Sequence, residues 1–186
     1  DMLDGPYESF HRNGAPDIKC TYKNGALDGL FESFHRNGAL DVKCTYKNGL
    51  IEGLHESFHS DGSPNTKCTY KNGVTDGTFE LFRANNQLEM KCVYRSGNID
   101  GLYESFHNNN AIGVKCYYKN GLKEGSYEEF DEDGTRNVKC TYKGDMLDGL
   151  YESFHRNGAP DIKCHYKNGL KDGLYESFRR GGSPDV

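Results

Sequence analysis

The feature that most constrains this chain is a period of 24 residues that runs through its whole length. All seven cysteines fall on it, and a glycine opens each copy, near positions 5, 29, 53, 77, 101, 125, 149 and 173. The fourteen residues 7–20 return unchanged as residues 151–164. A chain written in such copies packs each unit mainly on its neighbours, so the sequence predicts a repeat array.

Composition favours the same conclusion. Only 34% of the residues are hydrophobic, tryptophan is absent, and 23 residues are glycine. Such a chain has too little apolar material for a compact two-layer globule and suits an elongated array. We therefore expect one repeat array over residues 1–186. Because the first residue is Asp1, the chain is consistent with a piece of a longer array.

Two turns in each copy predict a β-hairpin. Asn37-Gly38 and its equivalents tolerate positive φ at both central positions, as a two-residue type I′ turn requires. Asn48-Gly49, with an acidic residue and Gly53 beyond it, marks a return loop. No segment has apolar residues at helical spacing, so we expect essentially no helix. The predicted fold is an all-β, elongated, solenoid-like array of about eight hairpins that form a continuous curled antiparallel sheet.

A two-residue first turn would fix the pairing of the strands. It places Glu32 opposite Lys43, Phe31 opposite Cys44, Ser33 opposite Val42 and Gly29 opposite Tyr46. A return loop centred between Gly49 and Leu50 would then place Lys43 opposite Glu56, Cys44 opposite His55, Val42 opposite Ser57 and Tyr46 opposite Gly53. A tighter loop centred on Asn48-Gly49 would shear the columns by two residues per repeat. Side chains keep the same face in either case, because the two registers differ by an even number.

Alternation along the strands separates two faces. The inner face is expected to carry the aromatic residue at position three of each repeat, which is two residues after the opening glycine, as Phe31 is after Gly29. It is also expected to carry the Ile/Val/Met positions, such as Val42, and two columns of residues. These columns are Cys20, Cys44, Cys68, Cys92, Cys116, Cys140 and Cys164, and Tyr22, Tyr46, Tyr70, Tyr94, Tyr118, Tyr142 and Tyr166. The other face carries a ladder of glutamates and lysines, threonine and leucine positions, and one phenylalanine per repeat. The second face is expected to be largely solvated.

Two signatures identify a family resemblance. The patterns G-x-Y-x-x-F-x-x-N-G, as at residues 5–14, and Y-K-N-G-x-x-D/E-G, as at residues 22–29, resemble MORN repeats. The nearest type is the variant found in the YwqK antitoxin-like group of bacteria and in large DNA viruses similar to marseilleviruses. The resemblance covers the whole chain and implies an elongated array of β-hairpins. Such arrays serve as scaffolds, as adaptors near membranes and as modules of enzymes.

The cysteines and histidines do not predict a metal site or disulfides. Equivalent cysteines would lie two strands apart, roughly 9–10 Å, which exceeds the Cα separation of a disulfide. His35 and Cys44 would be roughly 13 Å apart, too far to share a zinc ion. We expect buried, free thiols, and no metal or cofactor. The histidine column His11, His35, His59, His107 and His155 is interpreted as solvated residues beside the first turn, with a pH-sensitive contact as the alternative.

No catalytic site is predicted. A catalytic site needs different groups that converge at one place, whereas every candidate here recurs at equivalent positions. The expectation is therefore a protein without enzyme activity. The net charge of -5 argues against nucleic acid or an anionic membrane surface as the main partner. No apolar run is long enough to insert in a membrane.

The remaining candidate is a row of phenylalanines on the Glu–Lys face. Either each ring packs on the stem of its lysine or a neighbouring leucine, or the row binds a protein partner or a second copy of the array. The row is Phe10, Phe34, Phe58, Phe82, Phe106, Phe130, Phe154 and Phe178. We expect an interaction scaffold, with an antitoxin-like inhibitor or a binding module of a longer enzyme as alternatives. Free thiols favour a reducing intracellular compartment, in the cytoplasm of a bacterium or of a virus-infected host cell.

Overall fold

A computed structural model describes residues 2–185, and within them it contains strands, turns and bends but no helix. The strands are antiparallel and come from hairpin repeats, so the predicted all-β hairpin array is confirmed at this level. The contacts divide the chain into two compact units. The first contains residues up to Leu88 together with Tyr94–Gly97, and the second contains Glu89–Val93 and the residues from Asn98 onward.

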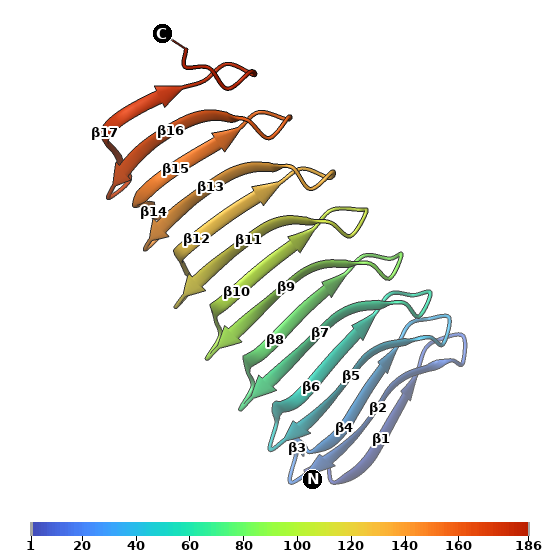
Figure 1. The fold of residues 1–186 in the computed structure, drawn as a ribbon. Coiled ribbons are helices and arrows are strands. Elements are labelled where there is room, and N and C mark those ends of the chain that lie inside the picture. Colours follow the sequence, from blue (N-terminus) through green and yellow to red (C-terminus); the bar gives the residue numbers. More distant parts are fainter. Residues whose placement is uncertain (1, 186) are drawn as a thin grey trace. The chain divides into compact units, whose positions relative to one another are not determined.

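The first unit is a sheet whose strands pair in chain order, as Figure 1 shows. Each long strand is hydrogen-bonded to the next, so neighbouring hairpins lie side by side. Its strands are β1 (Gly5–Phe10), β2 (Pro16–Lys23), β3 (Ala26–Leu27), β4 (Gly29–Phe34), β5 (Leu40–Lys47), β6 (Leu50–Phe58), β7 (Pro64–Lys71) and β8 (Val74–Phe82).

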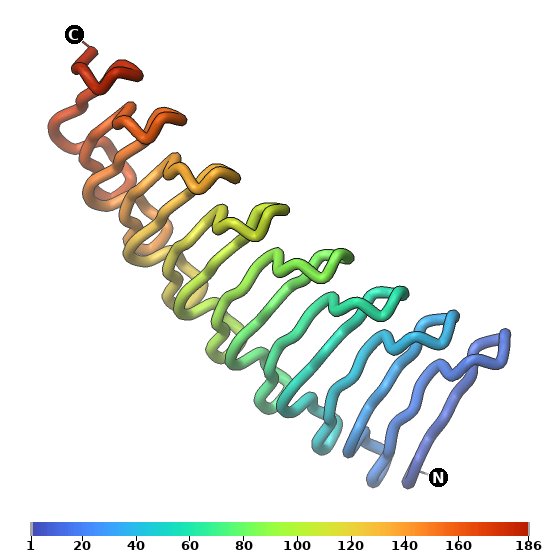
Figure 2. The backbone as a smooth tube through the Cα atoms, turned by 45° about the vertical axis from the view of Figure 1, so that its right-hand side comes forward, coloured from blue at the N-terminus to red at the C-terminus, as the bar shows by residue number. Residues whose placement is uncertain are grey.

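The second unit repeats this arrangement. Its strands are β10 (Asn98–Phe106), β11 (Ile112–Lys119), β12 (Leu122–Phe130), β13 (Arg136–Lys143), β14 (Met146–Leu147), β15 (Gly149–Phe154), β16 (Pro160–Lys167) and β17 (Leu170–Ser177). Strand β9 (Leu88–Arg95) contributes residues to both units. The backbone trace in Figure 2 shows the hairpin motif recurring along each unit.

The first turn of each hairpin is not the predicted type I′ turn. The amide of Gly38 donates to the carbonyl of His35, and the amide of His35 donates to the carbonyl of Ala39. Only Gly38 in this loop has positive φ, at 85°. The loop is therefore the three-residue kind, a type I turn followed by a left-handed residue. Asn37 was assigned the wrong conformation because Asn-Gly fits both turns.

The predicted pairing beyond this turn is nevertheless confirmed. Ser33 pairs with Val42 and Phe34 pairs with Leu40, so Asp41 has no partner in the ladder. This β-bulge cancels the one-residue shift in pairing that the three-residue loop introduces. All four predicted pairs between β4 and β5 are present, from Gly29–Tyr46 to Ser33–Val42.

The type I′ turn occurs at the return instead. Asn48 and Gly49 have φ values of 50° and 81°, and Lys47 pairs directly with Leu50. Tyr46 consequently pairs with Ile51, so the predicted pairing with Gly53 is wrong.

A second bulge prevents this tight turn from shearing the array. Tyr46 pairs with Ile51, but two residues further into the strand Cys44 pairs with His55. The extra residues lie around Gly53, whose φ is 84°. Lys43 therefore pairs with Glu32 on one side and Glu56 on the other, as predicted.

An acidic residue of each repeat caps the return turn of the next one. The carboxylate of Asp28 accepts a hydrogen bond of 3.1 Å from the amide of Asn48, and Glu52 accepts one of 2.7 Å from Asn72. The carbonyl of Leu27 accepts a hydrogen bond from Gly49 in the same contact. The acidic position of the D/E-G signature therefore ties consecutive repeats together.

Removing one such cap is expected to destabilise the array locally. Asp28→Ala leaves the amide of Asn48 without its acceptor, and we expect a loss of about 1 kcal/mol from the free energy of unfolding. Asp28→Asn keeps a side-chain oxygen and should cost less. Urea denaturation of both variants checks this, and equal effects would show that the acceptor oxygen does not matter.

Candidate interaction surface

The interior of each unit is a column of cysteines. All seven cysteines are free and buried, with exposed fractions between 0% and 7%, and they are the buried hydrophobic residues of residues 2–185. Each cysteine pairs with the position-three residue of its own hairpin, as Cys44 does with Phe31. A small apolar side chain fits here because aromatic rings surround it.

Aromatic pairs flank the cysteine column. The position-three ring of each hairpin contacts the tyrosine that pairs with the opening glycine, with ring centroids 5.6 to 6.0 Å apart. Phe31 and Tyr46 form one such edge-on pair, and Tyr103 and Tyr118 form a tilted one. Burial raises the pKa of Tyr118 to about 12. This face is packed with aromatic rings.

Burial also raises the pKa of six thiols, to about 11 for Cys92 and Cys140; the other four are Cys20, Cys44, Cys68 and Cys116. At pH 8 the thiolate fraction of Cys92 should be roughly a hundredfold lower than for an ordinary cysteine. Iodoacetamide should therefore leave these six thiols unmodified in the folded protein and modify them in denaturant. Mass spectrometry of both samples checks this; modification of folded Cys92 at the unfolded rate would contradict it.

The raised pKa values also predict the sign of a stability change. A thiol whose pKa is higher in the folded than in the unfolded state stabilises the fold as long as the thiol is protonated. This contribution is complete below the unfolded pKa of about 8.5 and is lost as the pH rises to about 11. The free energy of unfolding should decrease over that range.

Ion pairs cover the opposite face. Lys43 lies 3.3 Å from Glu32, and Lys115 lies 3.4 Å from Glu104. In the hairpin of β12 and β13, Glu128 lies 2.9 Å from Arg136 instead of forming an ion pair with a lysine. Since these side chains are partly solvated, each ion pair contributes little to the free energy of unfolding. The main effect of the ladder is to make this face polar.

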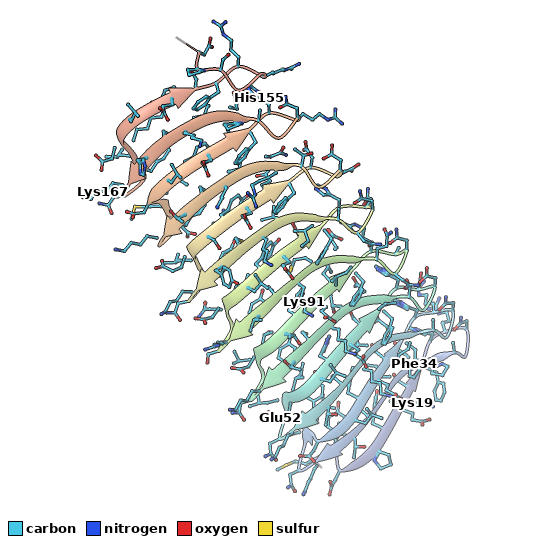
Figure 3. The ribbon with its side chains drawn as sticks, viewed as in Figure 1. Lys19, Phe34, Glu52, Lys91, His155 and Lys167 are labelled. Atoms are coloured by element: carbon cyan, nitrogen blue, oxygen red, sulfur yellow. The ribbon has the colours of Figure 1, made fainter. Side chains whose placement is uncertain are left out.

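The phenylalanine row lies on this face, but most of its rings are half-buried. The ammonium group of Lys19 lies 6.0 Å from the ring centroid of Phe34 in the next repeat. Both residues are labelled in Figure 3. Arg136 covers Phe130 in the same way, at 5.7 Å. Phe10 has no such neighbour within residues 2–185 and is 60% exposed. The eight phenylalanines remain a predicted partner-binding row, now with cationic side chains over part of it.

Besides Phe10, the exposed apolar side chains of this face include several leucines, for which the sequence predicted no role. Leu30, Glu32 and Phe34 alternate along β4 and share one face. Leu30 is 48% exposed and Leu54 is 43% exposed. In the second unit, Leu150 and Leu174 line a shallow hollow with Lys163, His165 and Glu176. The leucine that follows five of the eight opening glycines is the signal that could have identified them.

The histidines are not the solvated residues that were expected. His11 and His35 are half-buried, and each donates from Nε2 to the phenylalanine carbonyl of the next repeat, at 2.8 and 3.0 Å. The bulged aspartate lies beside the same nitrogen, 3.6 Å away for His11 and Asp17. Asn13 donates to the carbonyl of Arg36 at 2.7 Å. These side chains join consecutive first turns, as the acidic caps join the return turns.

Residues 2–185 include neither a cluster of metal-binding side chains nor a helix that could span a membrane. Within residues 2–185, no three His, Cys, Asp or Glu side chains gather closely enough to hold a metal ion. The same residues include no helix that is long and apolar enough to span a bilayer.

A comparison with protein-family profiles matched the MORN repeat variant over residues 3–24, 27–48, 51–72, 123–143 and 147–168, more than half of the chain. The chain belongs to the MORN repeat variant family. The matched segments correspond to hairpins whose caps and turns are described above, so the family signature records the contacts that join repeats. MORN repeats are commonly modules that bind proteins or membranes, and the repeat type is non-catalytic. A comparison with curated proteins gave no match.

Proposed function

We propose that this MORN-repeat protein is a non-catalytic scaffold that binds a protein partner through its Glu–Lys face. The observation that carries the proposal is the regular exposure of Leu30 and Leu54 among the ion pairs of the first unit. Exposed apolar residues inside a polar surround are typical of protein-binding surfaces. The second unit repeats the pattern with Tyr117 and Leu150, which are 45% and 41% exposed.

The recurrence of one surface motif also suits a scaffold better than an enzyme. The second, third, fifth and seventh repeats each present a leucine (Leu30, Leu54, Leu102 and Leu150), a paired glutamate and lysine, and a half-buried phenylalanine in the same order along their strands. A partner that contacts several repeats gains from each contact at once, because the later contacts are intramolecular. The phenylalanine row belongs to this proposed surface as its edge beside the first turns.

The test is affinity capture from native host cells with matched variants. Leu30→Glu with Leu54→Glu should reduce recovery of the partner by at least about tenfold, because a charge replaces an apolar contact at the interface. Lys71→Glu, an exposed residue at the return edge, should retain the partner. If the leucine variant captured as much partner as the unaltered protein, the Glu–Lys face would not be the binding surface. A captured enzyme that loses activity on binding would identify the protein as the antitoxin-like inhibitor.

A further inference from the structure

Two grooves of the same construction lie between first turns of neighbouring repeats. In the first unit, His11, Arg12, Asn13 and Arg36 line one of them. In the second unit, the groove has the equivalent lining of His155, Arg156, Asn157 and Arg180. Each groove therefore brings together two arginines from consecutive repeats.

The arginines are exposed and available for a ligand. Arg12 and Arg36 occupy the first central position of the type I turn, which points away from the sheet. Within residues 2–185, Arg12, Arg36 and Arg180 form no ion pair with an acidic side chain. Arg156 lies near Asp133, whose pKa is lowered mainly by hydrogen bonds from Thr135 and slightly by this arginine.

The backbone beneath each arginine pair is fixed by hydrogen bonds between the repeats. Asn13 donates to the carbonyl of Arg36 at 2.7 Å, and Asn157 donates to the carbonyl of Arg180 at the same distance. His155, labelled in Figure 3, donates from Nε2 to the carbonyl of Phe178 at 2.8 Å. The two turns of a groove are thus held at a constant separation, which lowers the cost of ordering both guanidinium groups around one ligand.

At the turn position of Arg12, arginine occurs in four repeats, and two consecutive ones line each of these grooves. The turn positions equivalent to Arg12 in the intervening repeats are Ser60, Ala84, Asn108 and Glu132. The groove between the sixth and seventh turns is lined by Asn109, Asp131, Glu132, Asp133 and Arg156, and is acidic. An edge with acidic turns in a protein of net charge -5 cannot lie flat on an anionic bilayer. The arginine pairs therefore suit a compact anion.

We propose that each arginine-pair groove binds the phosphate group of a phosphorylated serine or threonine in a partner protein. Two guanidinium groups supply paired donors and two positive charges, which match a phosphate monoester of charge about -1.5 to -2 better than a single carboxylate. This inference rests on the proposed scaffold function and names a chemical feature of its partner. It also gives the first-turn edge a role separate from that of the Glu–Lys face.

Calorimetric titration with a short phosphoserine peptide tests the inference. The intact protein should bind two peptides per chain at low ionic strength, and the unphosphorylated peptide should not bind. Arg36→Ala should reduce the stoichiometry to one, and Arg36→Ala with Arg180→Ala should abolish binding. Lys23→Ala with Lys119→Ala removes two exposed cations at the return edge and should leave two sites. An unchanged stoichiometry in the double arginine variant would overturn the proposal.

A gain of binding provides an independent test. Asp131→His, Glu132→Arg and Asp133→Asn together give the sixth turn the residues of the first. In the double variant Arg36→Ala with Arg180→Ala, these changes should restore one phosphopeptide site, because Arg156 lines both the acidic groove and the groove with Arg180. Vesicles of phosphatidylcholine with phosphatidic acid should not bind; vesicle binding without peptide binding would identify a lipid phosphate instead and overturn the proposal. If the peptide fails to bind while the leucine variants still lose the captured partner, the proposed scaffold function is supported and the proposed phosphate sites are wrong.

Discussion

Replacing Cys44 with aspartate is expected to lower the free energy of unfolding by about 3 kcal/mol or more. The side chain of Cys44 is buried between strands, with Phe31 and His55 as its cross-strand partners. A carboxyl group in this position loses its hydration, which costs roughly 2–7 kcal/mol for a polar group. A hydrogen bond from the His55 imidazole would offset only part of that cost. Chemical denaturation followed by circular dichroism measures the change.

The matched control is Thr45→Asp, one residue along the same strand. Thr45 is exposed and lies on the opposite face, so this change should cost under about 1 kcal/mol. The two substitutions introduce the same carboxylate at adjacent positions, and only their faces differ. Similar losses for both variants would show that the cysteine column is not the interior.

Gly29→Val is expected to lower the free energy of unfolding by about 1–3 kcal/mol. Gly29 has a φ of 116°, which a β-branched residue adopts only with strain of roughly that size. A Cβ atom at this position would meet the Thr21 side chain at 3.7 Å, an ordinary contact distance, so the expected loss comes from the backbone conformation and not from a steric clash. Thermal unfolding of the variant measures the loss.

Leu30→Val is the control for the glycine substitution. It places the same valine on the next residue of β4, where φ is not positive and the side chain is exposed. We expect a change within about 0.5 kcal/mol. If both variants unfold at the same temperature, the opening glycine of the repeat is not a conformational requirement.

The repeat, the strand order and the two faces could be predicted because they depend on period and parity. Residues that recur every 24 positions must occupy equivalent places, and alternation assigns Cys44 and Lys43 to opposite faces whatever the loop length. The pairing of Glu32 with Lys43 also followed, since opposite charges select one register.

The turns could not be predicted with the same accuracy, because a longer loop and a β-bulge have opposite effects on the strand pairing and leave it unchanged. A three-residue loop with a bulge at Asp41 pairs the strands as a two-residue loop without a bulge would. Asn-Gly is compatible with both. At the return, the tight turn at Asn48 and the bulge near Gly53 combine the two alternatives that the sequence left open.

The contacts between repeats were missed for a different reason. Asp28 caps a turn 20 residues later, and His11 donates to a carbonyl 23 residues later. Neither partner can be inferred from local spacing, because each contact joins a side chain to a backbone group of the next copy. The invariant acidic residue before each opening glycine was the available signal for the cap.

The central structural claim is that a bulge keeps every hairpin in register with the next, and one nuclear Overhauser measurement tests it directly. Thr66 and Leu81 occupy repeat positions held mostly by other residues, so their signals can be distinguished. The structure pairs Thr66 with Leu81 across β7 and β8, while the turn beyond pairs Tyr70 with Thr75. We predict a cross-strand contact between the Hα atoms of Thr66 and Leu81 or between their flanking backbone protons. Contacts between Thr66 and Phe79 instead would mean that the tight turn sets the register alone, and would contradict the account.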